Sequence, residues 1–266
     1  MNILVCVKQV PDTAEIKIDP VKNTLIRDGV QSIVNPFDMY AVEAALRIKE
    51  GSADSQVTVI TMGPPQAKSA LTECMALGCD HAYLISDSAF GGADTLATSY
   101  TLSKVIEKLA GENGAFDMVF CGKQAIDGDT AQVGPEIAEQ LGLPQVTGAV
   151  SLSLENDAAE VKRETERGYE VLRCTLPLLV TFTKSEFDIR IPSLRDKLAA
   201  KRKQINVLTA ADIELDRGCV GLTGSPTRVK RSYTAGAGVK EGCVPVPDSE
   251  TAAEAAAEWI VRAINL

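Results

Sequence analysis

The feature that most constrains the fold is the regular alternation of short apolar runs with amphipathic segments through the first 145 residues. Strand-like apolar runs cover 3–8, 56–61, 81–86 and 117–121. Between these runs, apolar residues recur at the spacing of one helix face, as in Ala41, Ala44, Ala45 and Ile48. This β-α rhythm predicts an α/β fold with a doubly wound, mainly parallel sheet and helices on both faces.

The predicted helices have recognisable start and stop signals. Asn35-Pro36-Phe37-Asp38 combines a good N-cap residue, a proline for the first helical position and an early acidic residue. Glycines stand where the four helices are expected to end, at Gly51, Gly78, Gly111 and Gly142.

The pattern changes after residue 145. Alternating segments at 149–154, 159–166 and 169–175 predict antiparallel hairpins, and an apolar strand is expected at 178–183. We therefore expect one α/β domain over residues 1–205, which includes the segment 191–203. Residues 206–266 contain few large apolar side chains before an Ala-rich helix expected at 249–264. We expect this tail to be an arm that packs on another surface; the alternative is a disordered linker with a self-docked helix.

Composition excludes several classes of function. The chain has 27 Lys and Arg against 36 Asp and Glu, and the net charge of −9 argues against nucleic acid and anionic membranes as partners. One histidine, His81, argues against a His-rich metal site and a Ser-His-Asp triad. The seven cysteines, without a Cys-x-x-Cys pair, favour reduced thiols over a redox or metal role. With neither an 18-residue apolar run nor a basic leader, we expect a cytoplasmic protein.

Ligands of doubly wound sheets bind beyond the carboxyl ends of the strands, so the loops there are the candidate site. The loop at 122–132 is the most informative, because Gly128, Thr130 and Ala131 are small residues just before a helix. Backbone N–H groups at such a position can hold a phosphate. Asp129 or Thr130 could instead simply cap the helix. Neither a P-loop nor a Gly-x-Gly-x-x-Gly fingerprint is present in the sequence.

The loop at 86–95 is the second candidate. Gly91 and Gly92 allow a ligand to approach the backbone closely, while Asp94 and Thr95 can cap the next helix or reach a ligand. No pair of acidic residues is spaced diagnostically for acid–base catalysis. Chemistry supplied by a bound cofactor is therefore favoured.

These loops resemble those of the β subunit of electron transfer flavoproteins. The resemblance covers nearly the whole chain, including Leu4-Val5-Cys6-Val7-Lys8-Gln9-Val10, the Asn35-Pro36-Phe37-Asp38 helix start and Gly63-Pro64-Pro65-Gln66. It is strongest at Gly122-Lys123-Gln124-Ala125-Ile126-Asp127-Gly128-Asp129. The loop at 86–99 and the run Gly128-Asp129-Thr130-Ala131-Gln132-Val133-Gly134 resemble the electron-bifurcating members in particular.

The resemblance implies a heterodimer with an α subunit that carries its own FAD. In bifurcating members the β subunit binds FAD, oxidises NADH, and sends electrons to ferredoxin or flavodoxin and, through the α-subunit FAD, to an acyl-CoA dehydrogenase. In simpler members the β subunit holds AMP as a structural ligand. A nucleotide-binding regulator of similar fold is a further alternative.

The resemblance also implies roles for individual residues. No side chain need act as a catalytic acid or base, and no metal ligand is expected. The adenosine pocket is expected to be lined by Cys6, Asn35, Asp38 and Met62. The phosphates are expected at Gly122, Gly128, Asp129, Thr130, Ala131, Gln132 and Val133. The flavin is expected near Asp94, Thr95 and Thr98, and NADH near Phe90, Gly91 and Gly92.

Residues 191–203 resemble the family's recognition loop. Leu194 is expected to be the apolar anchor for the dehydrogenase, with Arg195 and Lys197 beside it. From composition alone, the same segment would be interpreted as a solvated charged helix. The arm from 206 is expected to pack on the α subunit.

Overall fold

The structure is a computed structural model, and it describes residues 1–12, 32–52, 54–155 and 158–230, together with 254, 256–258, 260 and 261. The described residues up to Lys230 belong to one compact unit. A second unit ends at Leu266, and its described residues are helical. The rest of the helix expected at 249–264 lies outside the described residues.

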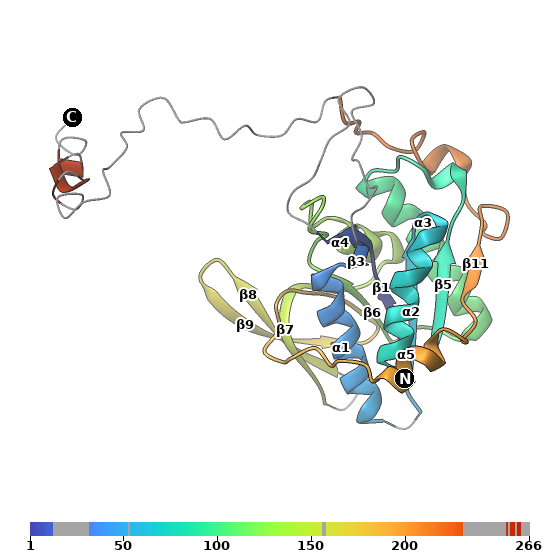
Figure 1. Cartoon of the computed structure of the whole chain (residues 1–266), viewed down its shortest axis with the longest axis horizontal. Helices are drawn as coiled ribbons and strands as arrows, with labels where there is room; N and C mark the ends of the chain where they lie inside the picture. The colour runs from blue at the N-terminus through green and yellow to red at the C-terminus, as the bar shows by residue number, and fades with distance from the viewer. Residues whose placement is uncertain are drawn as a thin grey trace. The chain divides into compact units, whose positions relative to one another are not determined.

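A nine-stranded sheet runs through the first unit in the order β11-β5-β4-β1-β6-β10-β7-β8-β9 (Figure 1). All neighbours from β11 to β7 pair in parallel, and β7, β8 and β9 pair antiparallel. The predicted mainly parallel sheet with an antiparallel extension is confirmed. The strands are β1 (Asn2–Cys6), β4 (Gln56–Met62), β5 (His81–Ile85), β6 (Met118–Gly122), β7 (Gln145–Glu155), β8 (Ala158–Thr165), β9 (Gly168–Thr175), β10 (Leu178–Phe182) and β11 (Asn206–Leu208).

Helices cover both faces of the parallel part. Ile3 and Val5 belong to a core cluster with residues of α1 and α2, whereas Leu4 and Cys6 belong to a cluster with α3 and α4. This alternation follows from the two-residue period of a strand buried on both faces. The helices are α1 (Pro36–Glu50), α2 (Lys68–Leu77), α3 (Thr95–Asn113), α4 (Val133–Leu141) and α5 (Leu194–Ala200). Short 3-10 turns are η1 (Pro65–Ala67), η2 (Ser88–Phe90) and η3 (Arg217–Cys219), and β2 (Gln9–Pro11) pairs antiparallel with β3 (Ser32–Val34).

Three of the four predicted helix ends are correct. Gly51, Gly78 and Gly142 cap α1, α2 and α4, and Gly142 has the left-handed backbone that suits glycine. Gly111 does not end its helix, because α3 continues to Asn113 and is capped by Gly114 at φ 91°. One glycine inside a helix costs only about 1 kcal/mol relative to alanine, so the residue alone does not stop a long helix.

Residues 206–230 belong to the same compact unit as the residues before them. This unit therefore extends beyond the boundary expected at 205. Strand β11 pairs in parallel with β5, and Ala210, Ile213 and Val220 are buried in the cluster that contains α3. A three-residue edge strand and three separated core residues produce no periodicity in the sequence. Packing of the later tail on an α subunit stays a prediction.

Replacement of Ile213 tests whether this segment is part of the domain's own core. Ile213 is 5% exposed, so Ile213→Ala should lower the free energy of unfolding of the chain by about 2–5 kcal/mol through the lost burial and the cavity left behind. Val229 is 83% exposed, and Val229→Ala should change that free energy by less than about 0.5 kcal/mol. Urea denaturation measures both values. Equal effects of the two substitutions would show that the segment is not packed as described.

Candidate functional site

The strand order of the sheet reverses beside β1. From β1 the chain proceeds through α1 to β4 and β5 on one side, and then returns to β6 on the other side. In the register of the sheet Cys6 lies opposite both Ile60 and Cys121, so these strands end at the same edge. A topological switch point of this kind is where open α/β sheets bind ligands. We call the residues around it, Cys6, Lys8, Asn35, Asp38 and 122–133, the switch-point site.

Asp38 is the hub of the switch-point site. Its side chain is buried at the start of α1, and its two oxygens accept three hydrogen bonds. The backbone N–H of Lys8 donates to Oδ2 at 2.7 Å, and the backbone N–H of Gly122 donates to Oδ1 at 3.1 Å. Asn35 Nδ2 donates to Oδ1 at 2.8 Å. One carboxylate thus joins the ends of β1 and β6 to the first turn of α1.

Asn35 extends this network to the loop after β6. It stands at the N-cap position as predicted, but its side chain does not cap the helix. Instead, Asn35 Nδ2 donates to the carbonyl of Gln124 at 2.8 Å, and its Oδ1 accepts the N–H of Ile126 at 3.1 Å. Gly122 must be glycine here, because a Cβ would collide with the side chain and backbone of Asp38.

The burial of Asp38 has an electrostatic consequence. Burial raises the pKa of this carboxyl from 3.8 to about 7, although the hydrogen bonds from Asn35, Lys8 and Gly122 act in the opposite direction. All of its polar partners are donors, which is the arrangement that suits an ionised carboxylate. The charge on Asp38 therefore has a substantial desolvation cost that the N–H groups only partly offset.

The loop at 122–132 has the backbone of an anion cradle. Asp129 and Ala131 lie in the left-handed region, at φ 52° and 54°, which is uncommon for residues other than glycine. Lys8 Nζ donates to Asp127 Oδ1 at 2.6 Å, and Gln124 Nε2 donates to Asp129 Oδ1 at 2.8 Å, so side chains hold the loop in place. Successive N–H groups in such a bend can converge on a phosphate.

Helix α4 begins directly after this loop and can supply further donors. Its N-cap residue is Gln132, and no side chain caps it, so the capping role considered for Asp129 and Thr130 is not what the structure has. A Cβ on Gly128 would meet nothing within 4 Å, which leaves open space over the loop. The uncapped N-terminus, the left-handed bend and the open space fit the phosphates of an adenine nucleotide.

The loop after β5 lies beside the switch-point site. Thr95 Oγ1 donates to Glu136 Oε1 at 3.1 Å and is 3.4 Å from Gln132 Oε1, so the start of α3 adjoins the start of α4. Thr98 lies one turn further along α3, and its N–H donates to the carbonyl of Asp94. The structure therefore brings together the residues expected at the phosphates and those expected at the flavin.

Both carboxylate oxygens of Asp94 accept hydrogen bonds from other residues of the chain. Oδ1 accepts the N–H of Ala97 at 3.1 Å and caps α3, while Oδ2 accepts the N–H and hydroxyl of Thr227 at 3.0 and 2.8 Å. Burial acts to raise the pKa of Asp94, but the hydrogen bonds from Thr227 and Ala97 hold it below its ordinary value. Sequence reasoning missed Thr227, because a single polar residue 133 positions away leaves no local signal.

The glycines expected beside NADH are packed by the same distant segment. A Cβ on Gly92 would lie 3.2 Å from Leu222, and the N–H of Leu222 donates to the carbonyl of Gly91 at 3.1 Å. Both glycines are nevertheless exposed. Phe90 is a core residue at 5% exposure, which disfavours its expected contact with NADH.

Three sulfur-containing side chains lie at the carboxyl ends of the strands, beside the switch-point site. Cys6 ends β1 and pairs with Cys121 of β6, and both are buried, while Met62 is half-buried at the end of β4. Hydrogen bonding with Cys6, together with burial, raises the pKa of the Cys121 thiol. The neutral thiol of Cys121 is therefore a poor nucleophile. All six described cysteines are free, and Cys219 is the exposed one among them; Cys243 lies outside the described residues.

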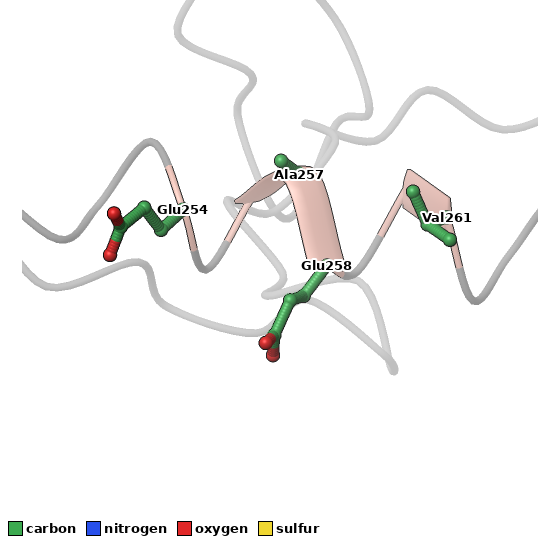
Figure 2. A pocket seen from close by; sticks show the side chains of 4 residues that line it. All are labelled: Glu254, Ala257, Glu258 and Val261. Carbon is green, nitrogen blue, oxygen red and sulfur yellow. The ribbon is translucent and has the colours of Figure 1, made fainter.

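Two hollows elsewhere do not suit a nucleotide. One is lined by Glu254, Ala257, Glu258 and Val261 near the C-terminus (Figure 2), and its two carboxylates would repel phosphate. The other is a polar, open hollow that includes Asp80, His81 and Lys203 at the amino end of β5, away from the strand ends where ligands bind. Within the described residues, no helix is long and apolar enough to cross a membrane.

Residues 191–203, which we call the docking segment, contain α5. Ser193 caps this helix by accepting the N–H of Asp196 at 3.2 Å. Leu194 is 74% exposed, and Ile191 and Leu198 are 89% and 53% exposed at i−3 and i+4 from it. Arg195 and Lys197 are exposed beside this apolar stripe. Sequence reasoning identified Leu194 but missed Leu198, which lies one helical turn further along α5, and the exposed Ile191 before the helix.

Comparisons with known proteins identify one family. The electron transfer flavoprotein domain matches residues 22–213. The chain is similar to the electron transfer flavoprotein subunit beta of Megasphaera elsdenii, with 52% identity over 236 residues, 88% of this chain and 87% of the relative. It is 50% identical over 234 residues, 88% of each chain, to the caffeyl-CoA reductase-Etf complex subunit CarD of Acetobacterium woodii. It is 44% identical over 256 residues, 95% of this chain and 90% of the relative, to protein FixA of Azorhizobium caulinodans.

Substitution of Asp38 by asparagine tests the hub. An amide cannot accept from every donor around it, so Asp38→Asn should destabilise the chain by about 1–3 kcal/mol. With a native pKa of about 7 against 3.8 for the unfolded chain, the native carboxyl keeps a proton that the unfolded one releases. The stability advantage of the wild type over Asp38→Asn should therefore fall as pH rises from about 4 to 7. Urea denaturation across that pH range measures the difference in free energy of unfolding between the two proteins. Asp188→Asn, at an exposed side chain, is the control. A difference that does not change with pH would contradict the raised pKa of Asp38.

Proposed function

Because the chain belongs to the electron transfer flavoprotein family, in which its relatives are β subunits, we propose that it binds FAD at the switch-point site, accepts electrons from NADH and bifurcates them. Members of this family transfer electrons, and a β subunit implies an α-subunit partner. Membership sets aside an unrelated nucleotide-binding regulator. The proposed acceptors are ferredoxin or flavodoxin and, through the FAD of the α subunit, an acyl-CoA dehydrogenase.

The observation that carries the proposal is the uncapped start of α4 next to the left-handed bend at Asp129 and Ala131. Backbone donors can hold the phosphates there while the Asp38 network keeps the loop against β1 and α1. Cys6 and Met62 offer apolar surface to an adenine ring. FAD, when bound, supplies the hydride and single-electron chemistry, so this chain needs no acid, base or nucleophile.

The adjacency of α3 and α4 favours a ligand larger than AMP. Thr95 and Glu136 join the loop after β5 to the loop after β6, so a dinucleotide could extend from one to the other. The resemblance of 86–99 and 128–134 to bifurcating members supports the same conclusion. Gly91 and Gly92 remain the proposed place of NADH, approached from their exposed side.

One observation favours the alternative of a structural AMP. Asp94 has both oxygens occupied by Ala97 and Thr227, and Leu222 fills the space beside Gly92. A flavin ring would have to fit around these contacts, whereas AMP would need only the loop at 122–132 and the start of α4. The two candidates therefore differ in their use of the loop after β5.

The docking segment is the proposed contact for the dehydrogenase. Its stripe of Ile191, Leu194 and Leu198 is exposed apolar surface, with Arg195 and Lys197 at the rim. Such a surface suits a partner with an apolar pocket and an acidic rim. The name of the relative CarD, a subunit of a caffeyl-CoA reductase-Etf complex, supports a partner that acts on a CoA thioester.

Nucleotide counting in the αβ complex decides between the two candidates. We expect two FAD per heterodimer and NADH-dependent flavin reduction. Gly128→Val should preserve the melting temperature of the nucleotide-free protein, because a Cβ there meets nothing within 4 Å, yet its extra bulk should displace one of the two FAD molecules. One FAD together with AMP would contradict the bifurcation proposal and favour the alternative. Full occupancy in Gly128→Val would show that the phosphates bind elsewhere.

Leu194→Ala tests the docking proposal. Loss of a central apolar anchor should raise the KM for the dehydrogenase by about tenfold, because truncating a residue that contributes to binding costs more than about 1 kcal/mol. NADH-driven flavin reduction without the dehydrogenase should be unchanged. Val207→Ala, at a side chain 43% exposed on the edge strand β11, is the control. An unchanged KM in Leu194→Ala would remove this segment from the interface.

A further inference from the structure

A buried carboxylate on α1 holds the residue that precedes the docking segment. The side chain of Glu43 is only 3% exposed. Arg190 donates to it three times: Nε to Oε2 at 2.8 Å, Nη2 to Oε1 at 3.1 Å, and the backbone N–H to Oε2 at 3.2 Å. Arg47 Nε adds a fourth hydrogen bond, to Oε1 at 2.9 Å. Glu43 thus binds both the side chain and the main chain of Arg190.

The contacts are those of an ionised pair. Burial acts to raise the pKa of Glu43, but hydrogen bonds from Arg190 and Arg47 bring it below its ordinary value. A buried ion pair adds little net stability, since desolvation offsets most of the attraction, and such a pair can instead specify one conformation. The bidentate geometry of Arg190 leaves little freedom in the direction of the chain at this point.

The same face of α1 holds the residues just before Arg190. The guanidinium of Arg47 lies 4.6 Å from the centroid of the Phe187 ring, and the Tyr40 ring meets Phe187 edge-on at 6.3 Å. Arg190 Nη1 also donates to Glu50 Oε1 at 2.6 Å. Residues 187–190 are therefore fixed along three turns of α1.

The chain emerges from these contacts into the apolar stripe. Ile191, the next residue, is 89% exposed, and the exposed Leu194 and Leu198 follow one turn apart on α5. At the far end the chain is fixed again, because Ala200 is 2% exposed and Lys203 Nζ donates to the carbonyl of Cys79 at 3.2 Å. The docking segment is thus held at Arg190 and along α5, which packs against α2, while its large apolar side chains stay exposed.

We propose that Glu43 is a positioning residue that, through Arg190, sets the direction in which the docking segment leaves the domain and so presents Leu194 to the dehydrogenase. This inference rests on the proposed docking function. Glu43 lies on α1, the helix whose first turn carries Asp38, so one rigid element orients both the nucleotide loops and the docking segment. Nothing in the local sequence around either residue indicates this pairing across 147 positions.

A double-mutant cycle on the αβ complex tests the inference. The complex is reduced chemically, so that the result does not depend on NADH, and electron delivery is measured against dehydrogenase concentration. Glu43→Gln should raise the KM by about tenfold with kcat unchanged, the signature of lost partner binding. In the Leu194→Ala background the same change should raise KM by less than about twofold, because residues that act through one contact are not additive.

Controls separate positioning from damage to the fold. Arg190→Gln removes the same ion pair by changing its more exposed partner. It should reproduce the rise in KM, and it keeps the test valid if Glu43→Gln folds poorly. Glu50→Gln, at a side chain 64% exposed, should change KM by less than about threefold. The positioning role would be overturned if Glu43→Gln raised KM by the same factor in the wild type and in the Leu194→Ala background. It would also be overturned if the rise in KM followed loss of bound nucleotide. No effect of Leu194→Ala would instead overturn the docking function itself.

Discussion

The site depends on the Asp38 carboxylate, which accepts hydrogen bonds from three N–H groups. Two of the donors are backbone groups at the ends of β1 and β6, the strands on either side of the switch point. Without that carboxylate, both strand ends would have unsatisfied donors in a buried place. The arrangement also requires Gly122, because any side chain there would occupy the position of Asp38. The geometry of the loop at 122–132 follows from this one buried carboxylate.

Helix α1 has a second buried charge, and the two serve different surfaces. Asp38 orients the loops at the carboxyl edge of the sheet, and Glu43 holds the chain before the docking segment. Both carboxylates are surrounded by donors rather than by water, which makes their positions well defined. A subunit that receives electrons at one place and delivers them through a partner needs such fixed relations between surfaces.

The fold and part of the site could be predicted from the sequence because they depend on short-range signals. The two-residue and 3.6-residue periods identified the parallel sheet and its helices. The small residues at 128–131 indicated a loop that could hold phosphates, and that role stays a prediction. Asp94 was harder, since an acidic residue before a helix can cap it or bind a ligand. Its bonds to Ala97 and Thr227 show the capping role and a tether that no local pattern indicates.

The sequence by itself determined the order of strands and helices along the chain and the absence of an obvious catalytic side chain, and its family resemblance singled out Leu194. Only the tertiary structure decided that residues 206–230 complete the sheet and pack on the loop after β5, and that Glu43 meets Arg190. The physical reason is range. Periodicity indicates which face of a helix or strand is buried. Hydrogen bonds between distant residues depend instead on how the folded chain brings distant segments together. A single residue such as Thr227 or Arg190 therefore produces no pattern in the sequence.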